Sequence, residues 1–106
     1  MAEENNNQLK KFQEETVNSV LNKVTLMQES GELKVPDNYH VGNNLKLAWL
    51  HLQDLKDKND KPALQVCDKA SIANALLEMV IKGLSVSKKQ GYFIPYGDKL
   101  EFQPSY

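Results

Sequence analysis

The sequence lacks most residues on which metal and nucleotide chemistry depends. Among its 106 residues are no arginine, one cysteine and two histidines. Cys67 has no partner for an internal disulfide, and the few cysteines and histidines cannot form a structural zinc site. Neither a G-x-x-x-x-G-K-[ST] phosphate loop nor a G-x-G-x-x-G motif occurs. We therefore expect no metal, no cofactor and no enzymatic activity.

The sequence also lacks any apolar run long enough to cross a bilayer, and no signal peptide opens it. Hydrophobic residues make up 41% and charged residues 25%, as in an ordinary soluble domain. We expect a cytoplasmic protein that makes no membrane contact. The polar residues 1–6 are interpreted as a flexible tail, and residues 7–106 as a single helical domain.

The charge is distributed unevenly along the chain. Residues 1–60 hold seven lysines and ten acidic residues, a net charge of −3, whereas residues 61–106 hold six lysines and four acidic residues, a net charge of +2. Every basic residue is lysine, which meets phosphate as a flexible point charge and lacks the forked donors with which arginine reads a guanine edge. If the chain binds nucleic acid, this composition favours backbone contact over base recognition.

Three main helices are predicted, at about residues 7–30, 44–56 and 69–82. The first two have apolar residues at helical spacing, and the third is apolar on nearly every face, as is typical of a central helix. Asp68 is positioned as the N-cap of the third helix. Gly31 and Gly83 are positioned as stops of the first and third. The apolar positions of the first are Leu9, Phe12, Val17, Val20, Leu21, Val24 and Met27; those of the second are Leu45, Ala48, Trp49, Leu52 and Leu55.

A β-hairpin is predicted at about residues 91–104, which gives an α+β fold that is mostly α-helical. Gly97 and Asp98 occupy the two loop positions of a short turn. The resulting register pairs Tyr96 with Lys99, Pro95 with Leu100, Phe93 with Phe102 and Tyr92 with Gln103. One face is then apolar throughout, with Phe93, Pro95, Leu100 and Phe102, and the other carries Tyr92, Ile94, Tyr96, Lys99, Glu101 and Gln103.

A two-stranded hairpin is marginally stable in water, and its outer edge invites pairing with another chain. Nothing follows Tyr106 in this sequence to cover that edge. The pattern therefore indicates either a part of a longer protein or a chain that is completed by a partner.

Four residues that could carry chemistry favour structural interpretations. His40 and His51 are interpreted as solvated side chains in a loop and on a helix surface. Cys67, among apolar neighbours, is interpreted as a small buried side chain. Trp49 lies on the leucine stripe of the second helix and is interpreted as core.

The remaining signal is positive charge beside aromatic residues near the C-terminus. Residues 82–99 contain four lysines and a single acid, Asp98. Tyr92 and Tyr96 share the mixed face of the hairpin with Lys99, and this combination holds single strands by phosphate attraction and base stacking. The alternative is a solvated turn whose tyrosines lean on neighbouring helices. The candidate DNA-binding residues are Lys82, Lys88, Lys89, Tyr92, Tyr96 and Lys99.

Residues 63–106 resemble the RecT family of phage single-strand annealing proteins. The resemblance is carried by a helix opening after "CDKAS", by "VIKGLSV", and by "GYFIPYGDKLEFQPSY". The residues that fall on the family signature in order are Gly91, Ile94, Pro95, Tyr96, Phe102, Gln103 and Tyr106. One departure is Gly97, because family members often carry a lysine directly after the Pro-Tyr pair.

The resemblance implies ATP-independent annealing of single-stranded DNA in phage homologous recombination, in the cytoplasm of a bacterial host. It further implies a homo-oligomeric ring or filament and a phage exonuclease as a partner. The chain would be the N-terminal portion of a larger RecT-like fold and would contribute mainly to oligomerisation. Two other hypotheses stay open: a small helical interaction module that acts by strand addition without binding DNA, and a degenerate remnant without activity.

Overall fold

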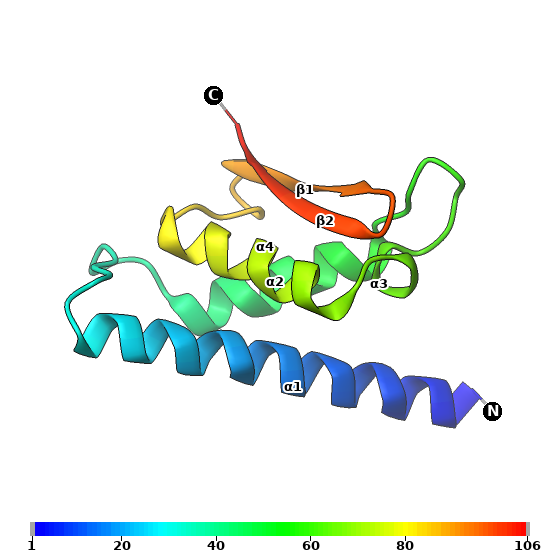
Figure 1. Ribbon diagram of the computed structural model, residues 1–106, viewed down its shortest axis with the longest axis horizontal. Helices are drawn as coiled ribbons and strands as arrows, with labels where there is room; N and C mark the ends of the chain where they lie inside the picture. The colour runs from blue at the N-terminus through cyan, green and yellow to red at the C-terminus, as the bar shows by residue number, and fades with distance from the viewer. Residues whose placement is uncertain (1, 106) are drawn as a thin grey trace.

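The computed structural model describes the backbone of residues 2–105 and the side chains of residues 10–105. It contains helices α1 (Ala2–Glu29), α2 (Val41–Asp54), α3 (Ala63–Val66) and α4 (Lys69–Ile81), followed by strands β1 (Gly91–Tyr96) and β2 (Lys99–Pro104). Helix α4 lies between α1 on one side and the β-hairpin on the other, and α2 packs against both α1 and α4 (Figure 1). The predicted α+β class, with three main helices and a C-terminal hairpin, is confirmed.

Helix α1 begins earlier than the sequence indicated. Its backbone is helical from Ala2, so residues 2–6, for which we expected a flexible tail, belong to the helix. Gly31 follows its end with a φ of +81°, a conformation that glycine adopts without steric cost. Val20 and Val24 of the predicted stripe are buried, four others are half-buried, and the side chain of Leu9 lies outside the described residues.

The region between α2 and α4 is more ordered than the charged break that we expected. The carboxylate of Asp57 accepts hydrogen bonds from the backbone N–H groups of Asn59 and Lys61, each at 2.9 Å. A single β-bridge then pairs Lys56 with Pro62, and the one-turn helix α3 begins directly after it. A helix this short carries no amphipathic period, so the sequence analysis missed it.

Helix α4 has the two ends that the sequence predicted. The side chain of Asp68 accepts a hydrogen bond from the N–H of Ser71 at 2.7 Å, which caps the first turn. At the other end Gly83 has a φ of +64°, and its N–H donates to the carbonyl of Val80 at 2.9 Å. The N–H of Leu84 reaches back to Met79 at 3.1 Å, which completes a Schellman motif.

The core gathers apolar side chains from all the long elements. Trp49, at its centre, is fully buried, and its ring meets that of Phe12 edge to face with centroids 5.2 Å apart. Each large apolar side chain of this kind contributes roughly 1.5–3 kcal/mol when it is fully buried. The buried apolar residues of the helices are Val20, Val24, Leu45, Ala48, Trp49, Leu52, Ala63, Ile72, Ala75, Leu76, Met79 and Val80.

The hairpin has the predicted register along its whole length. Gly97 has a φ of +60° while Asp98 does not have a positive φ, which is the pattern of a type II′ turn. The inner face lies against α4, with Phe93, Leu100 and Phe102 buried. The rings of Phe93 and Phe102 face one another across the strands with centroids 5.4 Å apart.

Gly91 has a steric role at the start of β1. A Cβ atom at this position would lie 2.3 Å from the ring of Phe102 and 3.0 Å from the carbonyl oxygen of Gln103. Real Cβ contacts do not occur at such distances, so the ring of Phe102 occupies the space that a larger residue would need. The absence of a side chain at Gly91 is therefore what lets Phe102 pack over the strand.

We expect Gly91→Ala to destabilise the fold by about 1–3 kcal/mol, because overpacking displaces the ring of Phe102. Gly42→Ala in α2 is the matched control, since its Cβ would meet nothing within 4 Å and alanine favours a helix. Urea unfolding followed by circular dichroism measures both variants. Equal stability of Gly91→Ala and the parent would contradict this account of Gly91.

Candidate nucleic-acid interface

The outer face of the hairpin presents two tyrosines to solvent. Tyr92 and Tyr96 are each 52% exposed, and Ile94 lies between them on the same face. The two tyrosines are four residues apart in an extended strand, or about 13 Å at 3.3 Å per residue. A flat, exposed aromatic surface of this spacing can accept stacked bases.

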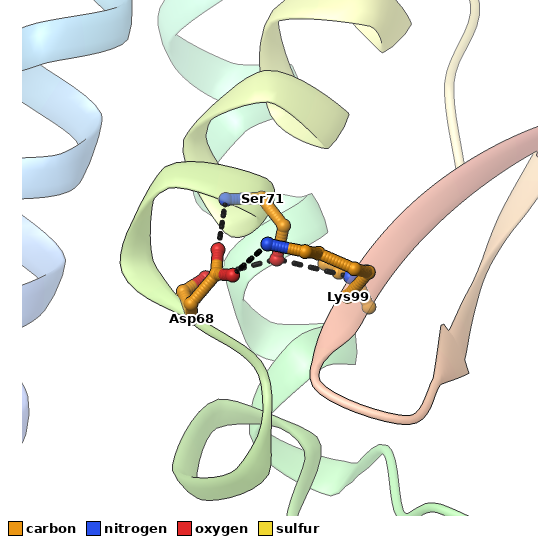
Figure 2. Close-up of polar contacts among 4 residues, drawn as sticks. Asp68, Ser71 and Lys99 are labelled. Carbon is orange, nitrogen blue, oxygen red and sulfur yellow. Dashed lines mark hydrogen bonds and ion pairs between the residues drawn. The ribbon is translucent and has the colours of Figure 1, made fainter.

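The turn end of this face is fastened to the start of α4 (Figure 2). Lys99 forms an ion pair with the carboxylate of Asp68, whose other oxygen caps the helix. The N–H of Asp68 donates to the carbonyl of Asp98 at 2.8 Å. Ser71 Oγ donates to the carbonyl of Asp68 at 2.9 Å and accepts from the N–H of Leu100 at 3.0 Å. We call Asp68, Ser71, Asp98, Lys99 and Leu100 the cap network.

The cap network changes the electrostatics of the candidate lysine at the turn. The hydrogen bond from Lys99, followed by that from the N–H of Ser71, lowers the pKa of Asp68. The same hydrogen bond with Asp68 raises the pKa of Lys99. Both groups are therefore charged at neutral pH, and the positive charge of Lys99 is balanced by Asp68. Lys99 consequently attracts a phosphate less strongly than the sequence indicated, because the negative charge of Asp68 lies beside it.

The other candidate lysines lie at the opposite end of the hairpin, around residues 82–90. Lys82 follows α4 and forms an ion pair with Glu78 at 3.6 Å. Lys88 and Lys89 are exposed and have no ion pair within the described part of the chain. Residues 82–90 contain three lysines and no acid, so this loop carries a formal charge of +3 next to the hairpin.

The six predicted residues thus form two groups. Tyr96 and Lys99 are paired beside the turn, whereas Tyr92 lies near the beginning of β1, close in sequence to Lys88 and Lys89. Six residues of strand, about 20 Å in length, separate the two ends. Glu101 lies between them on the outer face, opposite Ile94. The structure therefore places charge mainly at one end and aromatic surface along the strand.

The hairpin edges are less open than the sequence indicated. On the outer edge of β2 the N–H of Leu100 is bound by Ser71, and Pro104 has no N–H. On the outer edge of β1 Pro95 likewise has no N–H. A strand that added to either edge would find few backbone donors, since capped groups and prolines block part of each ladder.

A groove of about 490 Å³ lies between β2 and α4, beside the cap network. Its lining includes Glu78 and Glu101, and the one lysine in it, Lys99, is already paired with Asp68. Acidic side chains repel phosphate, so this groove does not suit the backbone of a nucleic acid.

Comparison with known families identifies the chain. A family model described as RecT family matches residues 42–106, which is more than half of the chain and includes α2, α3, α4 and the hairpin. The chain belongs to the RecT family. Neither the curated proteins nor the solved structures that were compared with it contain a match.

The RecT match is longer than the resemblance noted in the sequence, which began at residue 63. Family membership implies a role in phage recombination by single-strand annealing, and RecT proteins are annealing proteins and not known enzymes. Within the signature, Gly91 and Phe102 are explained by their mutual packing. Tyr106, the last signature residue, lies outside the described residues.

The structure agrees with the interpretation of the other residues with reactive side chains. His40 and His51 are exposed, and Trp49 is buried in the core. Burial raises the pKa of the Cys67 thiol, and nearby aspartates raise it further, so the thiolate is disfavoured. Among the side chains of residues 10–105 no group of three potential ligands could hold a metal ion. None of the helices described is long and apolar enough to cross a membrane.

Within the candidate site, sequence analysis missed the cap network of this RecT chain. Asp68 was recognised as an N-cap, but its ion pair joins it to a residue 31 positions away. No periodicity or motif relates two such positions. The one available signal was that Asp68 and Lys99 each lie at the beginning of a predicted element.

We expect the Asp68–Lys99 pair to make stability depend on pH at low pH. Because the pKa of Asp68 is lowered in the folded state, its contribution is complete above the ordinary carboxyl pKa and disappears as pH falls through the folded value. Asp68→Asn keeps the helix cap and removes the charge. Its stability should therefore be lower than that of the parent at pH 7 and equal to it at the acid limit. A difference that does not change with pH in thermal unfolding would contradict the ion pair.

Proposed function

We propose that the chain binds single-stranded DNA without ATP and anneals complementary strands during phage homologous recombination. The observation that carries the proposal is the RecT match over residues 42–106, which includes the exposed tyrosines and residues 82–90, called the lysine loop. The proposal includes assembly into a ring or filament, a phage exonuclease as a partner, and action in the cytoplasm of the bacterial host.

The chemistry of the surface suits annealing. An annealing protein must hold the backbone of one strand while its Watson–Crick edges stay free for the second strand. Lysine attracts phosphates without reading bases, and tyrosine stacks on the faces of bases and leaves their edges free. The lysine loop at residues 82–90 and the outer face of β1 supply these two contacts.

Assembly is supported by exposed apolar side chains on α2. Leu47 is 40% exposed and Leu50 is 55% exposed, and the two are neighbours on one helical face. Apolar surface of this kind is common at subunit contacts. The hairpin edges are poorer candidates for assembly, because Ser71, Pro95 and Pro104 block part of their ladders. For the same reason we do not propose an interaction module that acts by strand addition.

Fluorescent single-stranded oligonucleotide tests the electrostatic part of the proposal. The logarithm of the binding constant should fall with the logarithm of salt concentration, with a slope of about −0.7 for each phosphate contacted. Replacing Lys82, Lys88 and Lys89 by glutamine should reduce that slope by roughly 2 in magnitude. The control replaces the exposed Lys10, Lys11 and Lys23 of α1, on the side of α4 away from the hairpin, and should leave the slope unchanged. A parent slope near zero would remove the electrostatic role.

Substitution of the tyrosines tests the stacking part. Tyr92→Leu and Tyr96→Leu should each weaken oligonucleotide binding by roughly tenfold, because a stacked base contributes about 1–3 kcal/mol. Tyr→Phe at the same positions should restore binding, since stacking uses the ring and not the hydroxyl. Fluorescence anisotropy at one salt concentration measures all four variants. Equal loss in the leucine and phenylalanine variants would argue against stacking.

A further inference from the structure

A small polar pocket lies beside the lysine loop, separate from the outer face of the hairpin. It is formed where the loop before α2 meets the segment that connects α4 to β1, and its volume is about 100 Å³. A cavity needs roughly 10–15 Å³ to hold one water, so the pocket has room for a group of several heavy atoms such as one tetrahedral oxyanion. Its lining residues are Pro36, Asn38, Tyr39, Asn44, Gly83, Ser85, Lys88 and Gln90.

The pocket is rich in hydrogen-bond donors. The N–H of Ser85 donates to Gln90 Oε1 at 2.8 Å, which fixes the amide so that its NH₂ group remains a donor. Lys88 adds a charge that no carboxylate balances among the described residues, and Asn38 adds a second amide. No aspartate or glutamate lines the pocket, although Asp37 precedes Asn38 in sequence.

The walls of the pocket are held by contacts over long sequence distances. The hydroxyl of Tyr39 donates to the carbonyl of Leu84 at 2.8 Å, which joins the two loops. Burial raises the pKa of Tyr39 to about 12, so this donor stays protonated well into the alkaline range. Asn44 Nδ2 donates to the carbonyl of His40 at 2.9 Å. These contacts hold the two loops that line the pocket in place without any ligand.

We propose that this pocket binds a phosphate group, with Lys88 as its ionic contact and the amides of Gln90 and Asn38 as hydrogen-bond donors. The proposal rests on the proposed function where it names the source, a backbone phosphate of single-stranded DNA. Lys88 lies three residues before Gly91, where β1 begins. In this proposal, a single-stranded DNA whose phosphate occupies the pocket continues along β1 toward Tyr92. Lys88 and its neighbour Lys89 thus differ in role, because only Lys88 lines the pocket.

Titration of the full chain with inorganic phosphate tests the pocket directly. At constant ionic strength, balanced with chloride, the side-chain amide signals of Gln90, Asn38 and Asn44 should shift and saturate together in ¹H–¹⁵N NMR spectra. Lys88→Gln should weaken this binding by roughly tenfold, as expected for loss of a charged hydrogen-bond partner. Lys89→Gln makes the same charge change on the adjacent residue and should leave the affinity within twofold of the parent.

Two results would overturn the proposed phosphate site. The chemical shifts could grow linearly without saturation, or Lys88→Gln and Lys89→Gln could lose equal affinity for phosphate. Either result indicates attraction by general surface charge. A parallel titration with the dinucleotide dTpdT identifies the source. If dTpdT binds with higher affinity than inorganic phosphate, and the Tyr92 signals shift as well, the ligand of the pocket is a phosphate of the DNA backbone. If phosphate binds as described and no oligonucleotide binds, the pocket stands as a site for a free phosphorylated ligand and the proposed function fails.

Discussion

The attachment of the hairpin to the first turn of α4 is the interaction on which the rest of the C-terminal region depends. Two antiparallel strands alone are marginally stable in water, and here they bury only one face. The cap network supplies an ion pair and hydrogen bonds at the turn, while Phe93, Leu100 and Phe102 supply apolar contact along the strands. Because Asp68 caps α4 and also binds Lys99, the helix terminus and the turn are fixed by one carboxylate.

Much of the fold could be predicted because its signals are local. The Gly97–Asp98 turn and the strict alternation around it determine the register, and Asp68 and Gly83 mark the ends of α4 through their own backbone preferences. Signals that depend on distant residues could not be read in the same way. The pairing of Asp68 with Lys99 spans 31 positions. Helix α3 was missed for another reason, because its four residues are too few to show a helical period. The early start of α1 was missed because polar residues alone do not distinguish a helix from a tail.

The sequence predicted which residue types could form the candidate DNA-binding surface, but it did not predict how they are arranged in space. Sequence grouped Lys82, Lys88, Lys89 and Lys99 by proximity along the chain, yet the hairpin carries Lys99 to the far end and places it against Asp68. What remains for a phosphate is the loop at residues 82–90. Its lysines act without arginine beside them, so the surface attracts a charged polymer without selecting a base sequence. The tyrosines then add contact with base faces at the neighbouring strand.

The hydroxyl of Ser71 both donates to the carbonyl of Asp68 and accepts from the N–H of Leu100. A single oxygen therefore bridges helix and sheet, and its hydrogen bond with the N–H of Leu100 is lost when the two separate, whereas its bond to Asp68 lies within the helix terminus. It follows that the N–H of Leu100 is released only when the ribbon and the first turn of α4 open away from each other. The amide proton of Leu100, although it points away from its partner strand, exchanges with solvent as slowly as that shared opening allows.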